Sequence, residues 1–113
     1  MVTGLAVVNA ATGQHATISE VSQISMRTYS ESEIQRYVVS GGAIGKAGAY
    51  GIQDEMFHPA ELVDGCFLNV VGLPVCALFQ LLRQEGVVVM PRKSWKPPVQ
   101  CRACPLRQQE ETL

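Results

Sequence analysis

The sequence predicts a small α/β protein, and three observations carry that prediction. Apolar residues alternate with polar ones near the N-terminus, which indicates strands. Two later segments, one after Ser30 and one after Pro74, carry apolar residues at helical spacing. A length of 113 residues with 47% hydrophobic content suits one domain with one core. We expect that domain to cover residues 1–90 and residues 91–113 to form a disordered tail.

The N-terminal segment predicts a β-hairpin. An apolar run at 5–8 is followed by a turn at 11–14, after which Ile18, Val21 and Ile24 are interleaved with polar residues up to Met26. The spacing between Ile18 and Val21 departs from a period of two, so we expect a β-bulge there.

A helix is predicted to begin after Ser30. Ser30 and Glu33 have the spacing of a capping box, in which each side chain satisfies a backbone amide of the other residue. Ile34, Tyr37 and Val38 then form an apolar stripe, and Gly41 supplies a residue that commonly ends helices. Glu33 could instead be a catalytic acid, but capping is the simpler explanation.

The segment 41–51 holds five glycines and a single lysine, Lys46. Bare backbone amides and one ammonium group suit phosphate oxygens, which favours a phosphate site. The order of residues is not that of a P-loop, and the composition also fits an ordinary flexible turn. Both interpretations stay open on composition alone.

The second half of the predicted domain contains a further strand and a further helix. We expect residues 66–71 to form a short buried strand after a turn at Asp64 and Gly65. Pro74 suits the first position of a helix that Gly86 ends. We expect its buried face to consist of Val75, Leu78, Phe79 and Leu82. Residues 87–90 are predicted to add an edge strand.

Charge and composition exclude several classes of partner. A formal net charge of −1 argues against nucleic acid and anionic membranes, because both are gripped by clustered lysine and arginine. We expect an anionic partner to be small. The chain shows neither a membrane span nor a secretory signal, so we expect it in the cytoplasm with reduced cysteines. Cys101 and Cys104 have zinc-site spacing, but we interpret them as incidental and predict no metal site in the protein itself.

Two blocks of sequence resemble a known family. Residues 46–53 read Lys-Ala-Gly-Ala-Tyr-Gly-Ile-Gln, and residues 69–74 read Asn-Val-Val-Gly-Leu-Pro after Gly65. This pair is similar to the signature of Maf proteins, also called septum-formation-inhibitor homologues, and the resemblance covers about residues 2–85. It implies the C-terminal portion of a Maf/ITPase-like fold, in which a mixed sheet is flanked by helices.

The resemblance also implies an activity. Maf proteins are nucleoside triphosphate pyrophosphatases that depend on a divalent cation, Mg or Mn, and this form of the block is similar to the dTTP/UTP branch. Carried over by position, Lys46 would neutralise charge near the phosphates as the catalytic residue, and Gln53 would help select the pyrimidine. Gly48 and Tyr50 would complete the nucleotide-binding set. An amide such as Gln53 offers both a donor and an acceptor to a base edge.

The sequence departs from the family in two respects. Gly42, Ala43 and Gly45 stand where the family has Glu-Pro-x-Asp before its lysine. The family's S-x-R-R segment and its Asp-Thr pair, whose aspartate is the base, have no counterpart here. Asp54, Glu55, Asp64 and His58 are better explained as surface, turn or loop residues. We therefore expect either a partial enzyme that needs a missing N-terminal half, or a non-catalytic remnant that acts as a nucleotide-binding or interaction module. An incomplete fold also predicts homo-oligomers.

Overall fold

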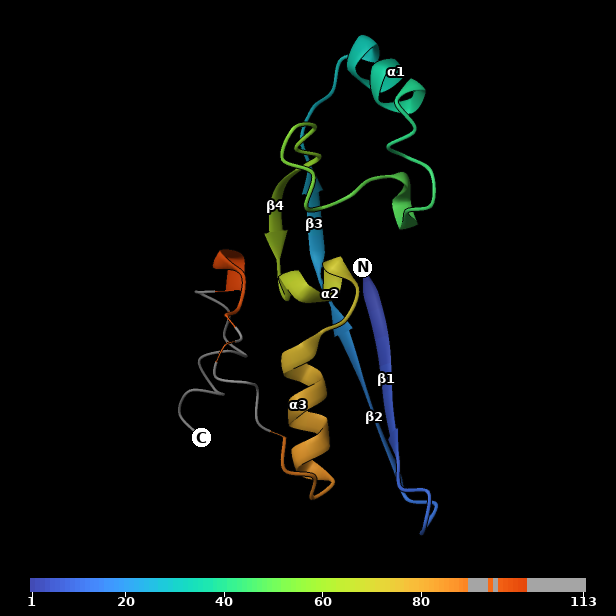
Figure 1. Ribbon diagram of the computed structural model, residues 1–113, viewed down its shortest axis with the longest axis vertical. Coiled ribbons are helices and arrows are strands. Elements are labelled where there is room, and N and C mark those ends of the chain that lie inside the picture. Colours follow the sequence, from blue (N-terminus) through green and yellow to red (C-terminus); the bar gives the residue numbers. More distant parts are fainter. Residues whose placement is uncertain (90–93, 95, 102–113) are drawn as a thin grey trace. The chain divides into compact units, whose positions relative to one another are not determined.

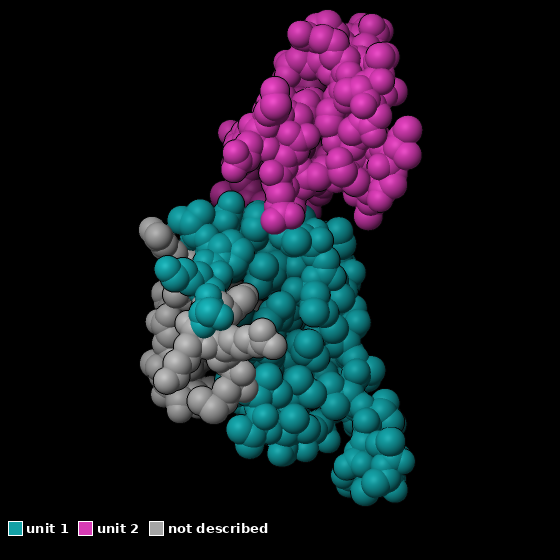
Figure 2. Space-filling view, viewed as in Figure 1, with its two compact units in different colours: residues 1–22, 65–113 teal, residues 23–64 magenta. Residues whose placement is uncertain are grey.

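The computed structural model describes residues 1–89, 94 and 96–101 of the chain. Within this part the chain is α/β, and Figure 1 shows its elements. The chain divides into two compact units (Figure 2). The first consists of residues 1–22 and 65–113, and the second of residues 23–64. The elements in chain order are β1 (Val2–Val8), β2 (His15–Val21), β3 (Gln23–Met26), α1 (Glu31–Val39), the 3-10 helix η1 (Ala47–Ala49), β4 (Ala60–Asp64), α2 (Phe67–Val71), α3 (Val75–Gln84) and the 3-10 helix η2 (Val99–Cys101).

The predicted hairpin forms the sheet of the first unit. β1 and β2 pair antiparallel in one continuous register from Val2 opposite Val21 to Val8 opposite His15. The predicted bulge between Ile18 and Val21 is therefore wrong. The interruption lies instead at Ser22, a buried residue that separates β2 from β3. The irregularity in pairing falls further on, between Ser25 and Met26, where β3 pairs antiparallel with β4.

The segment 66–71 is a helix and not the predicted strand. Phe67–Val71 forms α2, with Cys66 as its N-cap residue. Phe67 and Val70, three residues apart, are both buried, as expected for one side of a helical turn. A short apolar run does not distinguish a buried strand from a buried helical turn, which explains the error. The strand of this region is β4, which precedes the Asp64–Gly65 turn and was not predicted.

The predicted helix after Pro74 is confirmed, but its buried face consists of other residues than predicted. α3 packs against β1 and β2, and its buried residues are Ala77 and Leu81. The predicted face of Val75, Leu78, Phe79 and Leu82 is only half-buried. Pro74 occupies the N-cap position rather than the first helical position. Gly86, at φ 80°, ends the helix as predicted.

A polar network joins the N-terminus to α2 inside the first unit. Asn69, with 1% of its surface exposed, donates from Nδ2 to the carbonyls of Met1 and Glu20 and to the hydroxyl of Ser22. The Ser22 hydroxyl in turn donates to the Cys66 carbonyl over 2.8 Å. Side-chain amides are well suited to such a junction, because one group can satisfy several buried backbone acceptors.

The capping box of α1 is confirmed in the second unit. The Ser30 hydroxyl accepts from the Glu33 amide, and the Glu33 carboxylate accepts from the Ser30 amide. The helix ends at Val39, and Gly41 follows at φ 81°. Its apolar stripe is not buried within this part of the chain, since Ile34 is 46% exposed and Val38 58% exposed.

The C-terminal segment is described only in part. Residues 87–89 form no strand, so the predicted edge strand is absent there, and Met90 lies outside the described residues. η2 lies within the segment predicted to be a disordered tail, and it packs near α2 with Cys101 buried. Residues 91–93, 95 and 102–113 of that segment, including Cys104, lie outside the described residues. No helix in the described part is long and apolar enough to cross a membrane.

Candidate nucleotide site

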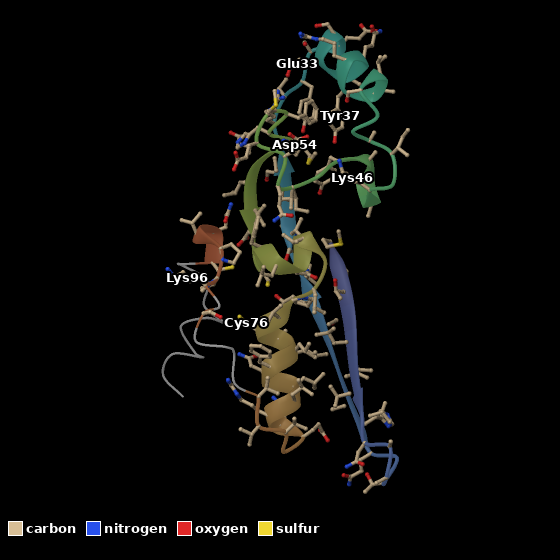
Figure 3. All side chains as sticks on the ribbon, viewed as in Figure 1. Glu33, Tyr37, Lys46, Asp54, Cys76 and Lys96 are labelled. Carbon is tan, nitrogen blue, oxygen red and sulfur yellow. The ribbon has the colours of Figure 1, made fainter. Side chains whose placement is uncertain are left out.

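The residues that the sequence analysis selects all lie in the second unit, between α1 and β4. Lys46 is the N-cap residue of η1, Gly48 lies inside it, and Tyr50 follows it. Gln53 lies in the next turn. Figure 3 labels Lys46 in this loop together with Tyr37 on α1.

The glycine-rich loop is ordered by its own hydrogen bonds. The Ile44 amide donates to the Gly41 carbonyl, and the Ala49 amide donates to the Lys46 carbonyl. Gly45 has φ 76° and Gly48 has φ 71°, values that glycine adopts readily. Ala49 also has a positive φ of 62° despite its side chain, a conformation that is uncommon and concentrated at functional sites. The loop thus follows a series of hydrogen-bonded turns.

The Lys46 side chain is hydrogen-bonded to a backbone carbonyl and remains exposed to solvent. Its Nζ donates to the Gly42 carbonyl over 2.8 Å. Its aliphatic stem passes Gly51, where a Cβ would lie 3.5 Å from the Lys46 Cε. The ion pair formed within the described residues joins Arg27 to Glu33, so no carboxylate neutralises Lys46 there. With one donor bonded to Gly42, the ammonium has donors left for an anion.

The carbonyl that accepts from Lys46 also accepts from Tyr37. The Tyr37 hydroxyl donates to the Gly42 oxygen over 2.9 Å. The Tyr37 ring stacks on Phe57 with ring centres 3.9 Å apart and planes 6° from parallel. Gly42 therefore receives two side-chain donors, one from the helix before it and one from the loop after it.

Gly48 and Tyr50 lie against each other. A Cβ at Gly48 would meet the Tyr50 ring at 2.9 Å, closer than side chains tolerate. Glycine at this position is therefore required both by its backbone angle and by the ring beside it. The pair brings an aromatic surface to the same short loop as Lys46.

Gln53 lies at an exposed turn that Asp54 organises. The Asp54 amide donates to the Gly51 carbonyl, which makes Ile52 and Gln53 the central residues of that turn. The Asp54 Oδ1 accepts from the amides of Met56 and Phe57. This bonding confirms Asp54 as a turn residue, and the exposed Gln53 side chain is accessible from solvent.

A second cation of the unit, Arg27, is hydrogen-bonded to other residues of the same unit. Its guanidinium donates to the carbonyls of Phe57, His58 and Thr28 and to the Glu33 carboxylate. It also lies over the rings of Tyr29, 4.5 Å from the ring centre, and Phe57. The sequence analysis missed this cluster, because its members lie at separate points of the chain and Tyr37 was counted only as an apolar helix residue.

The hydrogen bonds of this cluster account for Glu33 without a catalytic role. The hydrogen bond from Arg27, with the one from the Ser30 backbone, holds the pKa of Glu33 below its usual value. A carboxyl held ionised in this way is unsuited to donate a proton, so capping and ion pairing explain Glu33. Burial raises the pKa of Tyr29, against the opposing effect of Arg27. The Tyr29 hydroxyl donates to the Pro59 carbonyl.

The described residues do not fit a protein-made site for a divalent cation. No three histidine, cysteine or acidic side chains gather within this part of the chain. Gly42 and Gly45, beside Lys46, offer no side-chain oxygens. Cations such as Mg²⁺ take oxygen ligands, and here only backbone carbonyls adjoin Lys46 at those positions.

Comparison with known proteins finds a matching family and similar sequences. A family model described as Maf-like protein matches residues 1–85. A dTTP/UTP pyrophosphatase of Dehalococcoides mccartyi strain CBDB1 is 44% identical over 104 residues, which are 92% of this chain and 46% of that protein. A protein of the same name from Thermomicrobium roseum is 41% identical over 90 residues, 79% of this chain and 41% of that protein. The chain spans about half the length of the curated relatives it matches.

Proposed function

The chain belongs to the Maf-like protein family, and on that premise we propose that it forms the nucleotide-holding part of a pyrophosphatase for dTTP and UTP. The similar proteins of Dehalococcoides mccartyi and Thermomicrobium roseum carry that activity in their names. In this reaction water attacks the α-phosphorus, the bond to the bridging oxygen breaks, and a monophosphate and pyrophosphate leave.

The observation that carries the proposal is the state of Lys46. Its ammonium is exposed, bonded to a neutral carbonyl and set in a loop ordered by its own hydrogen bonds. Negative charge builds on the phosphate oxygens and on the departing pyrophosphate as the bond breaks. A cation already in place stabilises that charge without reorganising during the reaction.

The neighbouring residues divide the remaining tasks of binding. We assign the Tyr50 ring, supported by Gly48, to contact with the sugar or base. We assign Gln53 to the edge of the pyrimidine, because its amide both donates and accepts hydrogen bonds. These roles follow from the position of the residues on the same loop and the turn after it.

Two components of the reaction are assigned outside the described residues. We propose that the base that activates water comes from a part of the protein beyond these residues, because Glu33 and Asp54 are already committed to capping and to a turn. We also propose dependence on Mg or Mn bound through the triphosphate oxygens, as is usual for Mg²⁺ at phosphate sites. No step of the mechanism is assigned to that cation, since the residues here form no site for it.

Several apolar side chains of the second unit are largely exposed, which suggests that a partner covers them. Met56 is 98% exposed, Val39 87% and Ile44 80%, so we propose that a homo-oligomer or the missing N-terminal half covers them. Sedimentation of the chain as a single monomeric species would contradict the homo-oligomer. Nucleoside triphosphates are made and used in the cytoplasm, and we propose that the protein acts there.

Binding of dTTP and UTP to the chain, measured by titration calorimetry with Mg²⁺ present, tests the proposed function. We expect Lys46→Gln to weaken binding about 10- to 100-fold, the size of one charge-assisted hydrogen bond. Arg36→Gln is the matched control, because it removes one exposed cation from the same unit. Equal affinity of Lys46→Gln and the unchanged chain would contradict the role of Lys46 at the phosphates. Binding without any pyrophosphate release, once the other half is supplied, would favour the non-catalytic remnant.

A further inference from the structure

The carbonyl of Gly42 joins two side chains that the sequence keeps apart. It accepts from the Tyr37 hydroxyl over 2.9 Å and from the Lys46 Nζ over 2.8 Å. A carbonyl oxygen has two lone pairs, so both bonds can form at once. The position of this single oxygen therefore sets the place of the Lys46 ammonium.

We propose that Tyr37 is a positioning residue for Lys46, a role that rests on the proposed function of Lys46 at the triphosphate. Tyr37 does not reach the substrate in this proposal. Its hydroxyl fixes the Gly42 carbonyl, and that carbonyl holds the ammonium with its remaining donors facing solvent. A cation fixed before binding loses less freedom when the phosphates arrive.

The Tyr37 ring is held by stacking and lies close to Gly42. Phe57 stacks on it in nearly parallel orientation, and Tyr29 stacks on Phe57 with ring centres 5.1 Å apart. A Cβ at position 42 would meet the Tyr37 Cε2 at 2.6 Å. The absence of a side chain at Gly42 thus allows the ring to lie this close.

The other cations of the unit are poorly placed for the same task. Four hydrogen bonds, to three carbonyls and to Glu33, hold the Arg27 guanidinium within the unit. Arg36 is bonded to the Ser32 carbonyl on the exposed side of α1. Positioning of charge for an anion in this unit therefore falls to Lys46 and to the residues that hold it.

Tyr37→Phe tests the proposal, because it removes the hydroxyl and keeps the ring in its stack. The matched control is Tyr29→Phe, which removes a hydroxyl bonded to Pro59 from the same aromatic stack. The first readout is the NMR order parameter of the Lys46 Cε methylene, with the exposed Lys96 as internal reference. We expect Lys46 to be more ordered than Lys96 in the unchanged chain and in Tyr29→Phe, and to lose that order in Tyr37→Phe.

The second readout is affinity for dTTP. We expect about fivefold weaker binding in Tyr37→Phe, the size of one neutral hydrogen bond, and no change in Tyr29→Phe. If the unchanged chain does not bind dTTP, the proposed function fails while the NMR comparison still decides the role of Tyr37. Lys46 order that is equal to that of Lys96 in the unchanged chain, or that is unaltered by Tyr37→Phe, would overturn the proposal.

Discussion

Glu33 illustrates how a residue that could be catalytic is explained by two structural bonds. It completes the capping box with Ser30 and pairs with Arg27 at 2.9 Å. Both bonds are stronger with the ionised carboxylate, and together they lower the pKa of Glu33. The spacing in the sequence predicted the first bond. The second was invisible to it, because nothing local specifies that Arg27 folds toward the start of α1.

The lowered pKa of Glu33 gives a stability prediction with a definite sign. A carboxyl whose pKa is lower in the folded state stabilises the fold at high pH and loses that contribution as pH falls through the folded pKa. We expect the thermal midpoint to fall as pH drops below the usual value of 4.5. The Glu33→Gln variant can still cap the helix, and its thermal midpoint should fall less steeply in that pH range. Parallel curves from calorimetry at several pH values would show that the ion pair has no role.

At the scale of elements, the strongest local signals gave the best predictions. The capping box located α1, and the Pro74 and Gly86 pair located α3. The hairpin of β1 and β2 was also predicted, although its interruption at Ser22 was placed too early. The errors fell on 66–71 and on β4, where short apolar runs carry no period long enough to distinguish strand from helix.

The short helix α2 is tied to the rest of its unit by long-range hydrogen bonds from Asn69. Asn69 lies on α2, and its amide reaches Met1, Glu20 and Ser22, which are distant in sequence. We expect Asn69→Ala to lower the free energy of unfolding by about 1–3 kcal/mol, the cost of leaving buried polar groups without partners. Ser19→Ala, on the exposed side of β2, should change it by less than about 0.5 kcal/mol. Urea unfolding of both variants measures the difference, and equal midpoints would contradict the role given to Asn69.

At the scale of the molecule, the chain separates its core from its candidate site. The buried apolar residues, among them Phe67, Ala77 and Leu81, lie in the first unit, whereas the Lys46 loop lies in the second. The sequence predicted which loop matters, because a lysine among glycines and the two-block resemblance both pointed to it. It did not predict the support beneath that loop, since the Tyr37, Phe57 and Gly42 contacts join positions that show no common pattern.

We propose that this chain supplies the phosphate-holding loop of a dTTP/UTP pyrophosphatase. The most direct test of this proposal is a chimera in which residues 1–85 replace the matching part of the Dehalococcoides mccartyi relative. We expect the chimera to convert dTTP and UTP to monophosphate and pyrophosphate, and Lys46→Gln to slow it about 10- to 100-fold while Arg36→Gln does not. Release of orthophosphate instead of pyrophosphate, or an undiminished rate in Lys46→Gln, would contradict the account.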